Sequence, residues 1–266
     1  MKKTLLVMAA ATAALATFAG IPDVKEIKLE GEYSGHLQDV WYDGGQYIYW
    51  AHTQDLLKTD LSGKIVRSAK VKGHHAGIQL KDGKLFIAVC GMQSETGGKT
   101  TPSCRVTVGE YDAETLELVK MHVTDIHDRS GSLTILEDGT FLVGCLRPQD
   151  ITPTQVRFHH LDKDFKLIKS YVIDNVPVRL GIETLKRKNG FLYLGMYGAD
   201  KSGKKLDFDT IKLDKDYKEV WRGRIGGSCG SFEDGAYRWI SQTKRRKGDE
   251  RKFFVSKLVR TDKLLP

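Results

Sequence analysis

Five aspartates recur along this chain at nearly equal intervals, and each ends a strand-like segment after which the chain turns back. They are Asp60, Asp112, Asp162, Asp214 and Asp262, separated by 52, 50, 52 and 48 residues. An aspartate in this position can accept hydrogen bonds from the backbone that follows it and so start a tight turn. A regular period of this length indicates a repeat architecture, in which one supersecondary unit recurs.

A second landmark precedes each aspartate, namely a short and very apolar segment. The five segments read QYIYWA, KLFIAV, TFLVGC, FLYLGMY and AYRWIS. Each follows a glycine-containing turn, and Asp82-Gly83, Asp138-Gly139 and Asn189-Gly190 are strong hairpin signals. Each unit therefore reads as strand, tight turn, apolar strand, variable loop, strand ending in Asp, short turn and strand.

Four antiparallel strands per unit of about fifty residues, repeated around an axis, make the blades of a β-propeller. The fifth unit stops after its third strand, whereas one unassigned strand lies at residues 25–33. We expect that strand to complete the last blade, because closing the ring removes the open sheet edges. The chain is thus predicted to be all-β, with a single five-bladed β-propeller over residues 20–266. A β-sandwich would not explain five evenly spaced landmarks.

The first nineteen residues lie outside the repeat. They contain two lysines, then an apolar run rich in Ala and Leu, then small residues before Gly20, a pattern typical of a secretory signal peptide. No cysteine stands at the expected cleavage point, and no later run approaches the ~18 apolar residues that a membrane span needs. We therefore expect residues 1–19 to be removed and the mature chain, with no transmembrane segment, to be periplasmic or secreted.

Export permits disulfides. Cys90 and Cys104 bracket one segment rich in Gly, Ser and Thr, and both should flank adjacent strands of one hairpin. We expect a disulfide between them. Cys145 and Cys229 have no such relation, and no CxxC or zinc-type spacing occurs, so these two are expected to be buried thiols.

The segment LLKTDLSGKIV resembles the NHL and YVTN repeats of exported bacterial propellers. The blade openings GHLQ, GHH and RLGI are similar to those of a further exported bacterial family. The resemblance covers essentially the whole mature chain and implies the fold, but it implies no activity, because its motifs are structural. The Ser-x-Asp-x-Gly-x-Thr-Trp box of sialidases is absent, so sialidase chemistry is not implied.

The loops on the two faces of the predicted propeller differ in length. Turns after the aspartates are short, whereas the opposite loops are long and basic: CGMQSETGGKTTPSC, LRPQDITPTQ, MYGADKSGKKLD and QTKRRKGDERK. Long loops on one end of a rigid scaffold usually carry binding residues. The formal net charge of +8 favours an anionic partner. Export and the lack of aromatic residues within the basic runs argue against nucleic acid.

The first strand of each blade lines the central channel of a propeller and starts at its rim. Polar residues enter these strands in four blades: His36, His74 with His75, His127 with Asp128, and Arg179 with Glu183. Adjacent strand residues point to opposite sides, so either His74 or His75 faces the channel, and the sequence leaves open which. Histidines converging on one rim can hydrogen-bond a ligand, transfer protons or bind a metal.

These positions give three sets of candidates. The candidate catalytic residues are His36, His75 and Glu183. The candidate ligand-binding residues are His74, Asp128, Arg147, Arg179 and Tyr197. The candidate ligands of a divalent transition metal are His36, His75 and His127.

The expected function is recognition of an acidic saccharide at a central pocket lined by His and Arg, with Arg179 neutralising a carboxylate. Cleavage of that saccharide, as a lyase or as a glycoside hydrolase assisted by a metal, stays open. The alternative is a non-catalytic lectin-like or protein-interaction scaffold. We expect a monomer.

Overall fold

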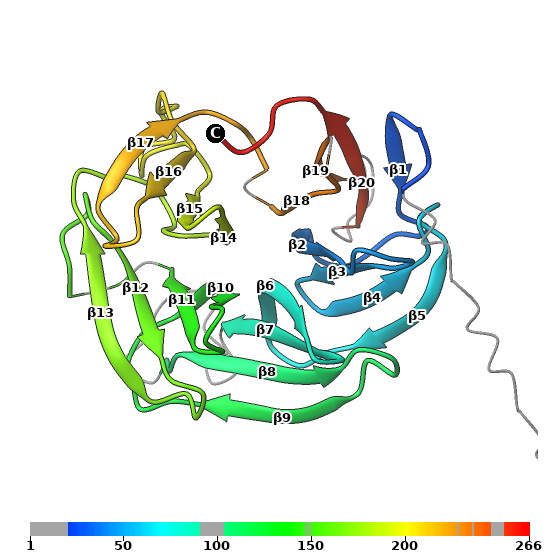
Figure 1. The fold of residues 1–266 in the computed structure, drawn as a ribbon, viewed down its shortest axis with the longest axis horizontal. Helices are drawn as coiled ribbons and strands as arrows, with labels where there is room; N and C mark the ends of the chain where they lie inside the picture. Colours follow the sequence, from blue (N-terminus) through cyan, green and yellow to red (C-terminus); the bar gives the residue numbers. More distant parts are fainter. Residues whose placement is uncertain are drawn as a thin grey trace, which may run out of the picture.

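Five four-stranded antiparallel sheets stand around a central axis, as Figure 1 shows. This computed structural model describes residues 21–90, 104–146, 148, 150–227, 229–235, 237–245 and 253–266. Within those ranges all regular elements are strands. The prediction of a five-bladed β-propeller is confirmed. The expected signal peptide lies outside the described residues, and none of the described part forms a helix of the length and apolarity that a membrane span requires.

Four blades are each built from consecutive strands, ordered from the channel outward. Blade 1 contains β2 (Leu37–Tyr42), β3 (Ile48–His52), β4 (Asp55–Thr59) and β5 (Ile65–Lys70). Blade 2 contains β6 (His74–Lys81), β7 (Lys84–Cys90), β8 (Thr107–Asp112) and β9 (Leu118–Val123). Blade 3 contains β10 (Ser130–Ile135), β11 (Phe141–Cys145), β12 (Val156–Leu161) and β13 (Leu167–Ile173). Blade 4 contains β14 (Thr184–Lys188), β15 (Phe191–Gly195), β16 (Thr210–Leu213) and β17 (Glu219–Gly223).

Blade 5 joins the two ends of the propeller. It contains β18 (Ser231–Glu233), β19 (Arg238–Arg245), β20 (Phe254–Thr261) and, as its outer strand, β1 (Glu26–Lys28). Ile27 pairs with Leu258, and backbone hydrogen bonds between Tyr33 and Phe254 extend the contact. The expected closure by the N-terminal strand is therefore present (Figure 1).

Four of the five repeated aspartates, namely Asp60, Asp112, Asp162 and Asp214, accept hydrogen bonds from the following backbone as expected. Asp60 Oδ1 accepts hydrogen bonds from the backbone N–H groups two and four residues further on, at 2.9 and 3.1 Å. Asp162 and Asp214 make the same pair of bonds. Asp82-Gly83 and Asn189-Gly190 both have positive φ at their two residues, as a type I′ hairpin turn requires. Local turn chemistry thus sets the hairpins that join the first to the second strand and the third to the fourth strand within a blade.

The apolar cores lie between neighbouring blades. Trp50 of blade 1 packs with Trp239 and Leu258 of blade 5, and Phe158 of blade 3 packs with Leu194 of blade 4. The second strands of blades 1 and 3 are covered on both faces, so every residue of β3 and of β11 is buried. This explains why those segments are apolar throughout instead of alternating.

Two neighbouring blades approach closely at a glycine of the channel wall. A Cβ built on Gly230 would lie 2.6 Å from Asp39 Oδ1 and 2.7 Å from the backbone nitrogen of Val40, and its φ is +103°. No side chain fits that gap between blades 5 and 1.

The C-terminal residues run from blade 5 toward blade 4 (Figure 1). The Leu265 backbone N–H donates to Glu233 Oε1 at 2.8 Å, and Lys188 Nζ donates to the Leu265 carbonyl at 3.2 Å. Tyr193 donates from its hydroxyl to the Pro266 oxygen. This segment bridges the inner strands of blades 4 and 5.

Candidate functional site

Two histidines from neighbouring blades meet at the rim where the long loops lie. His36 directly precedes the first paired residue of β2, which is Leu37, and His74 directly precedes His75 in β6. The imidazole centroids of His36 and His74 are 6.3 Å apart with their planes nearly perpendicular. Phe254 of blade 5 packs against the His36 ring at 5.9 Å. His74, and not His75, is therefore the residue of this pair that reaches the rim.

Gln38 holds the two rings together. Its side-chain nitrogen donates to His36 Nε2 and to His74 Nε2, at 2.8 Å in each case. An amide nitrogen only donates, so both Nε2 atoms accept and each neutral ring carries its proton on Nδ1. Gln38 lies two residues after His36, on the same side of the strand. The period of two could have identified Gln38 as a rim residue, although Gln38 was not among the residues predicted for the site.

Tyr197 of blade 4 completes this hydrogen-bonded group. Its hydroxyl lies 3.2 Å from His36 Nε2. Burial raises the pKa of Tyr197, and the nearby charge of Glu183 raises it further. The phenol therefore stays protonated and can donate at neutral pH. We call His36, Gln38, His74 and Tyr197 the rim cluster.

The imidazoles of the rim cluster are neutral. Burial lowers the pKa of His36. Burial, with smaller contributions from Arg129 and His36, lowers the pKa of His74 to about 4. Neutral imidazole, amide and phenol groups hydrogen-bond polar ligands without attracting them by charge. The rim cluster is suited to hydroxyl-bearing ligands.

Blade 3 contributes Arg129 instead of the expected His127. Arg129 directly precedes Ser130, the first paired residue of β10, as His36 directly precedes Leu37 in blade 1. It is buried, and its guanidinium lies 3.5 Å from Cys90 Sγ. His127 is exposed, with its Nδ1 2.5 Å from Arg105 Nη1. The prediction that His127 reaches the rim is therefore wrong, and Arg129, two residues further on, lies there instead.

The other three predicted rim residues have different positions. Glu183 is buried near enough to Tyr197 and Cys90 to raise the pKa of both. Arg179, expected in the pocket, is exposed, and its backbone N–H donates to the Ala199 carbonyl at 2.9 Å. Arg147 lies outside the described residues.

His75 packs between blades 1 and 2, contrary to its expected catalytic and metal-binding roles. Its Nε2 lies 2.6 Å from the Tyr111 hydroxyl, and its backbone N–H donates to the Thr53 carbonyl. Burial lowers the pKa of His75 to about 3. The ring is fully covered, so it has no access to a ligand in the channel.

Asp128 also faces away from the channel. Its Oδ2 accepts hydrogen bonds from Arg157 Nε at 2.8 Å and lies 3.2 Å from His159 Nε2. Asp128, Cys145 and His159 form the one group of three metal-ligand types that the described residues bring together. The Arg157 guanidinium already supplies the positive charge there, so the group is complete without a cation. The expected set of His36, His75 and His127 is not assembled.

The structure has Cys90 and Cys104 as two buried thiols, without the expected disulfide. Burial raises the pKa of Cys90, which disfavours the thiolate that oxidation requires. The cross-link stays a prediction for the protein under oxidising conditions. The segment between the two cysteines, residues 91–103, lies outside the described residues.

Comparison with known proteins assigns no family. No protein-family model matches the sequence, and no curated protein matches it either. A Bacteroides caccae protein of unknown function is similar in structure, with a TM-score of 0.44 and 15% identity over 71% of this chain and 81% of that one. The WD40 domain of Neurospora crassa Pan2 has a TM-score of 0.47 and 9% identity, over 84% of this chain and 75% of that one. BamB from Moraxella catarrhalis has a TM-score of 0.39 and 12% identity, over 85% of this chain and 74% of that one. The chain's own strand pairing is what makes it a five-bladed β-propeller.

Proposed function

We propose that this protein is an exported binding propeller that takes an acidic saccharide at the rim cluster. The observation that carries the proposal is the junction of His36, Gln38, His74 and Tyr197 from three blades, within hydrogen-bond reach of one another. Such groups exchange their mutual hydrogen bonds for bonds to sugar hydroxyls at little cost, because both sets are neutral. Arg129 supplies a cation beside His74.

The preference for an acidic saccharide rests on charge. Arg129 is buried, and a guanidinium in such surroundings pairs strongly with a carboxylate or sulfate. Exposed cations lie on the blade 4 segments of this face: Arg179 before β14, and Lys201, Lys204 and Lys205 between β15 and β16. They would steer an anion toward the channel, more weakly as salt rises.

Binding without cleavage fits these groups better than catalysis. Efficient general acid–base catalysis needs a pKa close to the working pH. The pKa of His74 is about 4, and the pKa of Tyr197 is raised far from neutrality. We therefore expect no bond cleavage, and the lyase and hydrolase alternatives become outcomes of the test.

Titration calorimetry with an oligogalacturonide and a neutral oligosaccharide of equal length tests the proposal. We expect the acidic ligand to bind and the neutral one to bind at least about tenfold more weakly, the equivalent of one charged hydrogen bond. His36→Ala and Gln38→Ala should weaken binding. His127→Ala removes a histidine from the neighbouring blade whose ring is exposed, and should leave binding unchanged. Equal affinity for both saccharides, or an unaffected His36→Ala variant, would contradict the proposal.

A protein-interaction scaffold is the second candidate, and one observation favours it. The outer strands β9 and β13 expose apolar side chains, with Val119 55% and Ile168 53% accessible. Apolar residues on adjacent outer strands are typical of interaction surfaces. Failure of every saccharide to bind the correctly folded protein would favour this candidate.

A further inference from the structure

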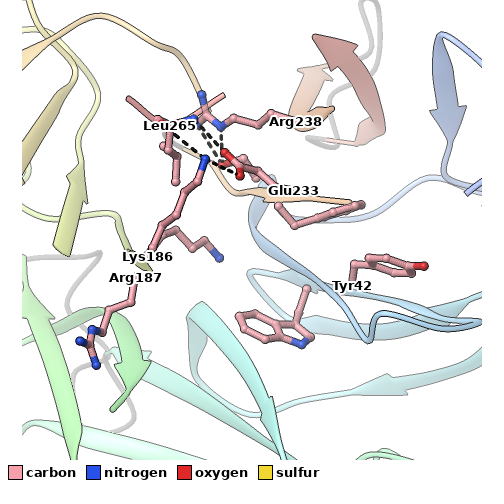
Figure 2. Close-up of a pocket in the computed structure, with 10 residues that line it drawn as sticks. Tyr42, Lys186, Arg187, Glu233, Arg238 and Leu265 are labelled. Carbon is pink, nitrogen blue, oxygen red and sulfur yellow. Dashed lines mark hydrogen bonds and ion pairs between the residues drawn. The ribbon is translucent and has the colours of Figure 1, made fainter. Parts of the chain in front are cut away.

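A cavity lies at the mouth of the channel opposite the rim cluster. Its volume is about 230 Å³. Trp41 and Tyr42 at the end of β2, Lys188 at the end of β14, and residues of β18 and β19 line it. The rim cluster stands at the other end of these inner strands, so the two sites are separate. Figure 2 shows Glu233, Arg238 and Leu265 gathered at one end of the cavity, with Tyr42 across from them.

One wall of the cavity is aromatic. Trp41, Tyr42 and Phe232 line it and are all partly accessible. The rings of Tyr42 and Phe232 are 5.3 Å apart and tilted by 35°. Partly accessible aromatic faces from two blades offer a planar ligand large contact area at little entropic cost.

The other wall is cationic. Four basic side chains line the cavity: Lys186, Arg187, Lys188 and Arg238. Three of them have a carboxylate nearby, in the ion pairs Lys186–Asp39, Arg187–Glu137 and Lys188–Glu233. The Arg187–Glu137 pair is loose, since its atoms are 3.6 Å apart and Glu137 is almost fully exposed.

Arg238 is the fourth cation, and its hydrogen bonds go to uncharged groups. Its guanidinium donates to the Ile225 and Gly226 carbonyls at 3.0 and 2.9 Å and to Ser231 Oγ at 2.9 Å. The residue is only 3% exposed. Among the described residues no carboxylate forms an ion pair with it. Burial lowers the pKa of Arg238, and the more distant charges of Glu233 and Asp209 offset part of that effect. A buried cation with no carboxylate in direct contact still favours an anion in the adjoining space.

We propose that this cavity binds a small planar aromatic anion. The ring would lie against Trp41 and Phe232, and the acidic group would face Lys188 and Arg238. A dry cavity of about 150 Å³ can hold benzene, so the volume here admits a ring with an acidic substituent. The ligand class differs from the saccharide of the rim cluster, so this proposal stands independently of the proposed function.

The C-terminal segment shapes one side of the site. Leu265 lines the cavity, and its backbone N–H and carbonyl bond Glu233 and Lys188. These bonds hold the Lys188–Glu233 ion pair at the cavity end in place. Lys188 thereby keeps a fixed position toward an incoming acidic group.

Fluorescence titration with two probes tests the proposal. Anilinonaphthalenesulfonate carries the anion, and phenylnaphthylamine has the same ring system without it. We expect the folded protein to bind the sulfonate at least about tenfold more tightly than the neutral probe. Trp41→Ala should weaken sulfonate binding by about tenfold, through loss of the stacking surface. Trp221→Ala, which removes a partly accessible tryptophan from the outer strand β17, is the matched control.

A charge variant guards against misfolding of Trp41→Ala. Arg187 is partly exposed and points away from the centre of the cavity (Figure 2), so Arg187→Glu should fold normally. The new negative charge should weaken binding of the sulfonate several-fold by electrostatic repulsion and leave binding of the neutral probe unaffected. Arg67→Glu, on the outer strand β5, should change neither. Equal binding of both probes, or sulfonate binding that survives both Trp41→Ala and Arg187→Glu, would overturn the proposal.

Discussion

Lys186 of blade 4 reaches across the channel to Asp39 of blade 1. Its ammonium donates to both carboxylate oxygens, at 3.1 and 3.2 Å. Asp39 also accepts a hydrogen bond from the backbone N–H of Ile78 in blade 2, at 3.1 Å. One carboxylate thus joins three blades at the propeller axis. Burial raises the pKa of Asp39, and Lys186 is the strongest influence in the opposite direction.

This relationship predicts an asymmetric double-mutant cycle. Lys186→Met should lower the free energy of unfolding by about 3–5 kcal/mol, because it leaves the Asp39 carboxylate buried without its cation. Asp39→Asn combined with Lys186→Met should recover a large part of that loss. Urea unfolding of the four proteins measures both effects. Strict additivity of the two single changes would show that the ion pair carries no coupling.

Closure of the ring predicts a strong dependence on β1. Ile27 is buried and pairs with Leu258, so Ile27→Ala should lower the free energy of unfolding by about 2–5 kcal/mol. Val24 lies just outside the strand, is more than a third exposed and serves as the control. Val24→Ala should change the free energy of unfolding by less than about 0.5 kcal/mol. Deleting residues 21–34 should prevent cooperative unfolding. A deletion variant with a native urea transition would contradict the role of β1.

Glycine at the seam of blades 5 and 1 predicts a steric effect. Gly230→Ala places a Cβ 2.6 Å from Asp39 Oδ1, in addition to the strain of φ +103°. Gly44 also has positive φ, at +79°, but nothing lies within 4 Å of its added Cβ. Gly44→Ala should therefore lower the free energy of unfolding only by the backbone strain of about 1–2 kcal/mol. Gly230→Ala should lower it clearly more. Thermal unfolding measures both variants. Equal losses of stability would show that blades 5 and 1 move apart to accept the added Cβ, and would contradict the prediction.

Three histidines with lowered pKa values predict acid sensitivity. Burial lowers the pKa of His52 and His74 to about 4 and that of His75 to about 3. The unfolded chain has the ordinary value of about 6.5. The folded form therefore binds fewer protons, its stability is fully present above about pH 6.5, and stability falls as the pH drops toward the folded pKa values. By about pH 5 each ring should have lowered the free energy of unfolding by about 2 kcal/mol relative to neutral pH.

Urea unfolding as a function of pH checks this prediction. His75→Gln keeps a polar group beside Tyr111 but removes the titration, so it should flatten the profile between about pH 6.5 and about pH 4. His127→Gln removes an exposed ring and serves as the control. Carboxyl groups with lowered pKa values, such as Asp128, act below this window. A profile that His75→Gln leaves unchanged would contradict the assignment.

Much of the fold could be predicted because its signals are local. Asp60 bonds to backbone groups only two and four residues away, and Asn189-Gly190 forms its turn by itself. Such contacts depend on neighbouring residues alone, so their repetition along the sequence reveals the blades. The candidate site was predicted less well. His36, His74 and Tyr197 were expected near the channel and meet there, whereas Gln38 and Arg129 were not singled out.

The sequence by itself determined the number of blades, the closing strand and the face that carries the long loops, because turn chemistry and the two-residue period act at short range. Only the tertiary structure decided which side chain of each inner strand reaches the channel. A shift of one residue turns a strand side chain to the other face, which separates His74 from His75. The start of each inner strand is set by pairing with distant segments, and this pairing brings Arg129 to the rim and leaves His127 in solvent.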